Sequence, residues 1–277
     1  MSISLASIQK SLNVSPPRLL IYGVQGIGKT EFCSNAPNPV FVLTEDGLGK
    51  NGVDAFPLSK NLEDVMNCFS SLAVEQHNFK TLVLDSLDWL EPFVQAKVCE
   101  TQKVKTIENI PYGKGFVMAM DFWREYIAAI NYLRDEKGMM IIQTAHSEIK
   151  RFESPESDSY DRYQIKLHKS AAALIQEHSD CVLFANYRTS ITEEDLGFKQ
   201  TRTRAVGSGN RVLYTQEMPT HSAKNRYSLP PQIEVKDPNW QDVWGVLANN
   251  IPWFKQFSIP VPTPEQTKNI ATAIKGD

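Results

Sequence analysis

A glycine-rich segment near the amino terminus has the residue types that bind phosphate groups. It reads Gly23-Val24-Gln25-Gly26-Ile27-Gly28-Lys29-Thr30 and fits the phosphate-binding pattern G-x-x-x-x-G-K-[ST] without a mismatch. Glycines let backbone N–H groups approach phosphate oxygens, and the start of a following helix adds positive potential. The pattern therefore predicts that Gly23–Glu31 bind ATP, with Lys29 on the β- and γ-phosphates and the Thr30 hydroxyl on Mg²⁺. The alternative is a glycine-rich turn that contains Lys-Thr by chance.

Two carboxylates follow apolar runs and are candidates for the chemistry at such a loop. Asp85 ends the run Thr81–Leu84, where it can hold Mg²⁺ directly or through water. Its other interpretation is a helix cap. Glu45 ends the run Val40–Leu43, and a carboxylate there can orient or deprotonate an attacking water. Because Thr44-Glu45-Asp46-Gly47 also has the composition of a turn, Glu45 is alternatively a solvated turn residue.

Three further polar residues are candidates for sensing or stabilising a γ-phosphate. His146 follows the apolar run that begins at Met139, so it can contact the phosphate as a sensor or be a structural histidine at a strand end. Lys224 and Arg226 lie far along the chain, between two strand-like segments. Such a pair can reach the nucleotide of a neighbouring subunit, as an arginine finger supplied in trans does. The alternative is a solvated basic turn.

The elements that must position these residues alternate between apolar strands and amphipathic helices. This alternation predicts an α/β fold with a mostly parallel sheet covered on both faces, and ligands at the carboxyl ends of its strands. Residues 186–230 read as short antiparallel strands and turns. The predicted strands are Arg18–Tyr22, Val40–Leu43, Thr81–Asp85, Met139–Ile142 and Cys181–Phe184; the predicted helices are Asn61–Glu75, Leu87–Glu100, Val117–Lys137, Ala171–Glu177 and Trp240–Asn249.

Length and composition indicate one large domain with appendages. The chain has 277 residues, 42% of them hydrophobic, and a net charge of −3, which excludes a surface coated in positive charge. No apolar stretch approaches membrane-spanning length, and the scattered cysteines suit a reducing compartment, so we expect a cytoplasmic protein with no membrane partner. We divide the chain into an N-terminal helix or linker (1–16), a core (17–235), a C-terminal helix (236–258) and a tail (259–277).

In the order of these pieces the sequence resembles the RecA-type ATPase core. It looks more closely like the phage nucleotide-binding proteins of the single-strand annealing class, which have a shortened RecA-like core. The resemblance covers roughly residues 17–235. The segments that carry it are Thr44–Gly47, Ala145-His146, Asp158–Tyr163, Arg211–Tyr214 and Ala223–Tyr227.

The resemblance implies a weak Mg²⁺-dependent ATPase that binds single-stranded DNA in an ATP-dependent way and anneals or exchanges strands. It implies a homo-oligomer assembled head to tail as a ring or filament, often with a single-strand DNA-binding protein as partner. Lys224 and Arg226 would then act in trans on the neighbour's nucleotide. RecA-type proteins commonly have Gln or Asn where His146 stands, which puts the sensor role in question.

In RecA-like assemblies two loops face the DNA, and the matching regions here are 101–115 and 147–169. Cations interleaved with aromatic residues suit a single strand, because phosphates pair with charge and bases stack on rings. The second region also contains five acidic residues, so a solvated mobile loop explains its composition equally well. Another candidate is the basic run Lys199, Arg202, Arg204 and Arg211. The candidate DNA-binding residues of the two regions are Lys103, Lys105, Lys150, Arg151, Arg162, Lys166 and Lys169.

Two other functions compete with DNA annealing. One is an ATP-controlled assembly or adaptor protein in replication or packaging, which the slightly acidic net charge of −3 favours. The other is a monomeric nucleotide or small-molecule kinase, which would need an acceptor pocket and an Arg-rich lid that the sequence does not indicate.

Overall fold

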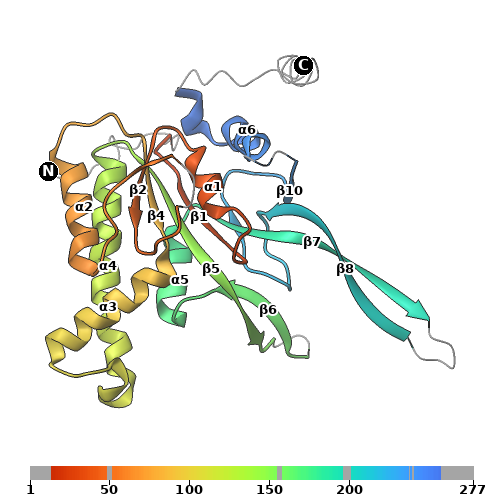
Figure 1. Cartoon of the computed structure of the whole chain (residues 1–277), viewed down its shortest axis with the longest axis horizontal. Coiled ribbons are helices and arrows are strands. Elements are labelled where there is room, and N and C mark those ends of the chain that lie inside the picture. Colours follow the sequence, from red (N-terminus) through yellow and green to blue (C-terminus); the bar gives the residue numbers. More distant parts are fainter. Residues whose placement is uncertain are drawn as a thin grey trace, which may run out of the picture.

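The computed structural model describes residues 14–48, 52–154, 158–195, 201–236, 238 and 240–256, with the backbone alone for 189–195 and 201–208 (Figure 1). The expected N-terminal helix, the tail 259–277 and Lys199 lie outside these residues. Within them, no helix is long and apolar enough to cross a membrane.

The described chain forms one large, mostly parallel sheet in the order β10-β8-β7-β1-β5-β4-β2-β3. The strand before the glycine-rich segment, β1 (Arg18–Gly23), pairs in parallel with β5 (Met140–Phe152) and β7 (Cys181–Asp195). β5 thus separates β1 from β4 (Thr81–Asp85), which pairs with β2 (Pro39–Leu43). The remaining strands are β3 (Asp54–Ala55), β6 (Tyr160–Ile165), β8 (Thr201–Tyr214), β9 (Lys224–Asn225) and β10 (Gln232–Val235).

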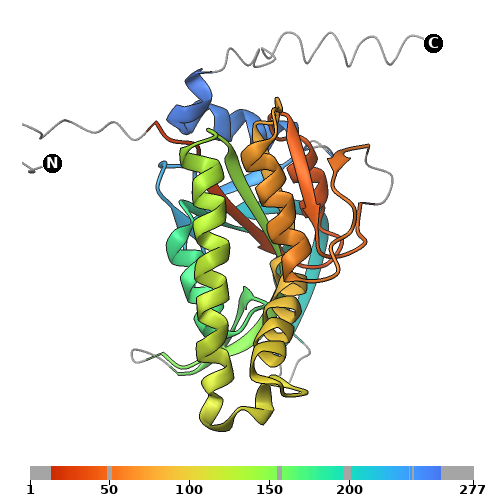
Figure 2. The ribbon, with the colours of Figure 1, turned by 90° about the vertical axis from the view of Figure 1, so that its left-hand side faces the viewer.

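Helices cover both faces of the sheet because the parallel strands are apolar on both sides. In β1, Leu20 and Tyr22 face a core built with α2 (Leu62–Val74), α3 (Leu87–Gln102), α4 (Lys114–Asp135) and α5 (Lys169–His178). Leu19 and Ile21 face the opposite core, built with α1 (Lys29–Ser34) and α6 (Gln241–Asn250). Figure 2 shows the long helices α2 and α4 side by side over the first face. Short 3-10 turns lie at Ile107–Asn109, Pro111–Gly113 and Pro252–Gln256. The α/β prediction with a mostly parallel central sheet is therefore confirmed.

Two segments differ from the sequence-based expectation. The region expected as a polar loop after Ile142 is instead a hairpin, because β5 continues to Phe152 and pairs antiparallel with β6. Beyond Phe184, the expected short strands are two long ones, β7 and β8, which form an arm that extends away from the body (Figure 1). The parts of β5 beyond Ala145 and of β7 beyond Ala185 pair through backbone hydrogen bonds and lack the apolar run that signals a buried strand.

The C-terminal helix α6 packs directly on the helix of the glycine-rich segment. Nε1 of Trp244 donates a 2.8 Å hydrogen bond to the carbonyl oxygen of Phe32 in α1. The rings of the same two residues stack with centroids 4.7 Å apart. α1 is therefore supported by a segment more than two hundred residues away in sequence.

Candidate nucleotide-binding site

The segment Gly23–Thr30, called the phosphate loop below, needs glycine at defined positions. Gly26 and Gly28 have φ angles of 74° and 99°, in the left-handed region that glycine adopts without strain. Gly28 also begins α1, since the N–H of Phe32 donates to its carbonyl oxygen over 2.9 Å. The loop therefore leads into a helix N-terminus, where backbone N–H groups suit an anion.

Lys29 is largely buried at the start of α1, with 7% of its surface exposed. Its Nζ donates hydrogen bonds of 3.3 Å to the carbonyl oxygens of Gly23 and Val24, so the ammonium group lies against the phosphate loop. Burial lowers the pKa of Lys29, and the carboxylates of Asp85, Asp88 and Glu45 oppose that effect. A cation in this position can neutralise phosphate oxygens bound in the loop.

Thr30 and Asp85 lie together, as a Mg²⁺ site requires. Oγ1 of Thr30 donates to Oδ2 of Asp85 over 2.8 Å, and Oγ1 of Thr144 in β5 donates to Oδ1 over 2.5 Å. Asp85 is 5% exposed, so a carboxylate has been buried at the carboxyl end of β4 beside the phosphate loop. Hydroxyl and carboxylate oxygens are the donors that Mg²⁺ prefers, and this pair fits the ion.

Glu45 lies on the far side of Asp85, at the end of β2. Its Oε1 accepts a 2.7 Å hydrogen bond from Oγ of Ser86. Thr44, the residue before Glu45, also binds Ser86. Its Oγ1 accepts a hydrogen bond from the Ser86 N–H over 2.8 Å and donates one to the Ser86 carbonyl oxygen over 2.7 Å. The carboxylate is thus held beside the candidate Mg²⁺ site, where it can orient a water molecule.

His146 stands at the end of the buried part of β5, opposite Gly23 of the phosphate loop in the β1–β5 register. Its Nδ1 pairs with Oδ2 of Asp88 at 2.9 Å, and its backbone N–H donates to Oδ1 at 2.9 Å. Burial raises the pKa of Asp88, but the hydrogen bonds from His146 outweigh burial and hold the pKa below its ordinary value. His146 therefore has a fixed orientation at the edge of the site.

These side chains share one cleft of about 490 Å³. The structure brings Lys29, Thr30, Glu45, Asp85 and His146 together there, as their positions at strand ends predicted. Sequence reasoning missed Thr144, Ser86 and Asp88, which hold the predicted residues. The available signal was that Thr144 and Ser86 are polar residues next to apolar runs and that Asp88 is an acid in the first turn of α3. The cleft is lined by Gln25, Gly26, Gly28, Lys29, Thr30, Glu31, Glu45, Asp46, Gly47, Asp85 and His146.

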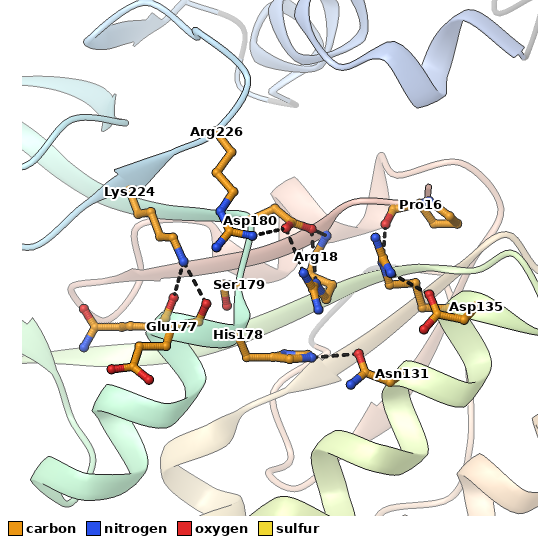
Figure 3. Close-up of polar contacts among 12 residues, drawn as sticks. Pro16, Arg18, Asn131, Asp135, Glu177, His178, Ser179, Asp180, Lys224 and Arg226 are labelled. Atoms are coloured by element: carbon orange, nitrogen blue, oxygen red, sulfur yellow. Dashed lines mark hydrogen bonds and ion pairs between the residues drawn. The ribbon is translucent and has the colours of Figure 1, made fainter. Parts of the chain in front are cut away.

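Lys224 and Arg226 lie away from this cleft, at the amino end of β1 (Figure 3). Nζ of Lys224 donates to the carbonyl oxygens of Gln176 and Glu177 at the end of α5, over 3.0 and 2.8 Å. Nη1 of Arg226 pairs with Oδ1 of Asp180 at 3.0 Å. Asp180 lies beside Arg18, the first residue of β1. Both cations are therefore at the opposite end of β1 from the phosphate loop of their own chain.

The candidate DNA-binding residues fall into two environments. Arg162 is 7% exposed, and its Nη2 pairs with Glu217 at 2.7 Å and donates to Ser222 at 3.2 Å. It therefore contributes to the interior rather than to a surface, unlike the other six candidates. The other six are all exposed. They lie just after α3 (Lys103 and Lys105), on or next to the β5–β6 hairpin (Lys150, Arg151 and Lys166) and at the start of α5 (Lys169).

Arg211 also lies elsewhere than expected. Instead of facing a DNA strand, its guanidinium group covers the ring of Trp240 at 4.9 Å and donates to the Pro238 carbonyl oxygen over 2.9 Å. A Cβ atom on Gly28 would lie 2.9 Å from Nη1 of Arg211. Arg211 thus connects the C-terminal segment to the phosphate loop.

The strand order, with β5 between the loop strand and the Asp85 strand, and the cleft at the strands' carboxyl ends define an α/β fold of the P-loop NTPase class. A family model described as an AAA domain matches residues 15–227. The chain therefore belongs to the AAA domain family, whose fold binds nucleotides. The comparison with curated proteins gave no match. Among solved structures, the crystal structure of the RadB recombinase is similar, with 12% identity and a TM-score of 0.41 over 72% of this chain and 80% of that one.

Proposed function

We propose that this protein binds ATP with Mg²⁺ in the cleft, hydrolyses it slowly, and uses the bound nucleotide to control binding and annealing of single-stranded DNA. The observation that supports this most is the convergence of Lys29, Thr30, Asp85 and Glu45 on one cleft from three separate strand ends. Bound Mg²⁺ would neutralise developing charge on the phosphates. Lys29 would hold the β- and γ-phosphates, and Glu45 would orient the attacking water.

The position of Lys224 and Arg226 supports a head-to-tail assembly. Arg226 lies at the opposite end of β1 from its own phosphate loop, and 52% of its side chain is exposed. This position suits Arg226 to a neighbour's nucleotide rather than its own. Its pairing with Asp180 does not prevent this, because Asp180 also accepts hydrogen bonds from N, Nε and Nη2 of Arg18. Asp180 thus remains paired when Arg226 leaves.

The exposed cations near the α3–α4 connection and on the β5–β6 hairpin support DNA as the partner. Tyr112 in that connection is 96% exposed, close in sequence to Lys103 and Lys105. On the hairpin, Lys150 is exposed and lies two residues from Phe152, which pairs with Tyr160, and Lys166 is exposed at the other end. Exposed cations with rings suit the phosphates and bases of a single strand.

The test is fluorescence anisotropy of a labelled oligo-dT titrated with protein, with and without Mg²⁺-ATP, at two salt concentrations. We expect binding that requires ATP, weakens with salt because phosphate contacts release counterions, and is lost in Lys29→Ala. If oligo-dT affinity is the same with and without ATP, and the same in the wild type and Lys29→Ala, control by the nucleotide is contradicted.

An ATP-controlled adaptor is the second candidate. It is favoured by the net charge of −3 and by Glu148, which pairs with Lys150 at 2.6 Å and reduces the positive field of the hairpin. A protein that binds ATP but no oligo-dT in any state would support the adaptor, and affinity capture with the ATP-bound protein would then identify its partner.

A further inference from the structure

Helix α3 contacts both ends of the β5–β6 hairpin through acidic side chains. At the first end, Asp88 accepts the backbone N–H of His146 and pairs with its ring, each over 2.9 Å. At the second end, both carboxylate oxygens of Glu91 accept the backbone N–H of His168, over 2.9 and 3.1 Å. The two ends are also joined directly, since the Lys166 N–H donates to the His146 carbonyl oxygen over 3.0 Å.

The two acids act from one face of one rigid element. Asp88 and Glu91 are three residues apart in α3, and residues at this spacing are neighbours on a helix surface. α3 begins at Leu87, two residues after Asp85 of the candidate Mg²⁺ site. A shift of Asp85 would therefore pass into α3 and reach both ends of the hairpin together.

A shared oxygen joins the nucleotide cleft to an exposed cation of the hairpin. Oδ2 of Asp88, which pairs with His146, lies 4.0 Å from Nζ of Lys166, whose side chain is 61% exposed. Asp88, Glu91, Lys150 and Lys166 line one hollow of about 310 Å³. The acids of α3 and the cations of the hairpin thus face the same space.

These contacts are stronger than ordinary surface pairs. The Asp88 side chain is 2% exposed and its acceptors serve His146, so loss of that partner would leave a buried charge with fewer hydrogen bonds. Glu91 is half-buried, and burial raises the pKa of its carboxyl while the His168 N–H lowers it. Hydrogen bonds to charged acceptors in such places are worth more than neutral ones, which suits them to transmit a displacement.

We propose that Asp88 and Glu91 are positioning residues that make the β5–β6 hairpin move with α3, so that the nucleotide in the cleft sets the placement of the hairpin. This rests on the proposed function, because it requires ATP to bind at the phosphate loop. It adds to a sensor role for His146, because Glu91 holds the second end of the hairpin through the His168 N–H. Glu91 does not line the described nucleotide cleft, so its substitution tests the positioning role separately from the sensor role of His146.

The test is amide hydrogen exchange measured by mass spectrometry, with and without Mg²⁺-ATP, on the wild type, Glu91→Ala and Glu91→Gln. Glu100→Gln is the matched control, because Glu100 is an exposed acid on α3 that pairs only with Lys97 among the described ion pairs. In the wild type we expect ATP to slow exchange at the phosphate loop and to change it across 147–165.

In Glu91→Ala we expect the loop protection to remain and the hairpin response to be lost. Glu91→Gln keeps one acceptor oxygen for the His168 N–H, so it should restore the response, and Glu100→Gln should behave as the wild type. Oligo-dT affinity should follow, with the effect of ATP on it reduced by about fivefold or more in Glu91→Ala.

Two results would overturn the role of Glu91 while ATP still protects the phosphate loop. In one, ATP changes exchange in the hairpin equally in the wild type and Glu91→Ala; in the other, ATP changes it in neither protein. Absence of loop protection in the wild type would instead overturn ATP binding itself, and the positioning role with it. The two failures are therefore distinct in one data set.

Discussion

The hydroxyl of Thr30 donates a 2.8 Å hydrogen bond to Oδ2 of Asp85, which joins the phosphate loop to the end of β4 across 55 residues of sequence. The other oxygen of Asp85 is bound by Thr144, so the carboxylate has one orientation. Fixed oxygen ligands cost little further ordering when an ion binds. In the proposed function, Mg²⁺ would therefore bind next to Asp85.

Asp85→Asn should weaken ATP binding in Mg²⁺ and leave binding in EDTA nearly unchanged, because the amide cannot neutralise the ion. We expect a loss of about tenfold in affinity, or roughly 1.4 kcal/mol. Calorimetric titration with ATP in both buffers measures this. Asp46→Asn is the control, since Asp46 lines the cleft but has no described bond to Thr30. Equal Mg²⁺ dependence in Asp85→Asn and wild type would contradict the metal role.

Gly23→Ala should destabilise the fold by roughly 1–3 kcal/mol or more, because overpacking forces the backbone to shift. A Cβ atom there would lie 2.1 Å from the carbonyl oxygen of Ala185 in the neighbouring strand. Gly245→Ala is the matched control: no atom lies within 4 Å of the added Cβ, and alanine in helix α6 should stabilise by up to ~1 kcal/mol. Urea unfolding of the two variants measures both, and equal stability would be inconsistent with the close approach of β1 and β7.

Stability should fall as pH drops below 6.5, in part through His178. Burial lowers the pKa of His178 from 6.5 to about 4, and the charge of Arg18 adds to this. The unfolded chain therefore takes up a proton before the folded protein does. The contribution of neutral His178 is complete above pH 6.5 and is lost as pH falls toward 4. Urea unfolding from pH 7 to 4 should show a shallower decline in His178→Gln, and an identical decline would remove His178 as a cause.

Arg226→Ala should keep ATP binding and cost less than about 1 kcal/mol of stability, because its pair with Asp180 is half exposed. Turnover in the assembled form should fall by roughly 10³-fold if the residue acts as an arginine finger in trans. Lys224→Ala is the comparison. Because Nζ of Lys224 donates to carbonyl oxygens at the end of α5, we expect its loss to lower the stability of the fold more than Arg226→Ala does. Steady-state ATPase rates across protein concentrations measure the effect; unchanged turnover in Arg226→Ala would remove the finger role.

Local patterns made part of this site predictable from sequence. The phosphate loop is a contiguous motif between an apolar strand and a helix. Asp85 and Glu45 could be placed because parallel strands bring their carboxyl ends to one edge of a sheet. The same rule placed His146 at this edge, whereas the register of β1 with β5, which puts His146 opposite Gly23, was not predicted.

Long-range relationships could not be read in this way. The pairing of β5 with β6 and of β7 with β8 depends on partners that no local periodicity reveals. Arg162 is a candidate DNA-binding cation by sequence, but its side chain is buried and pairs with Glu217. Trp244 reads as an ordinary amphipathic position in a terminal helix, and its bond to Phe32 in α1 appears only in three dimensions.

The most direct test of nucleotide binding is calorimetric titration of Mg²⁺-ATP into the wild type and Lys29→Ala, with thermal unfolding of both to show that the variant is folded. We predict saturable binding by the wild type and none by Lys29→Ala, because the variant lacks the cation that lies against Gly23 and Val24 of the phosphate loop. Equal ATP affinity in the two proteins would contradict the assignment of this cleft as the nucleotide site.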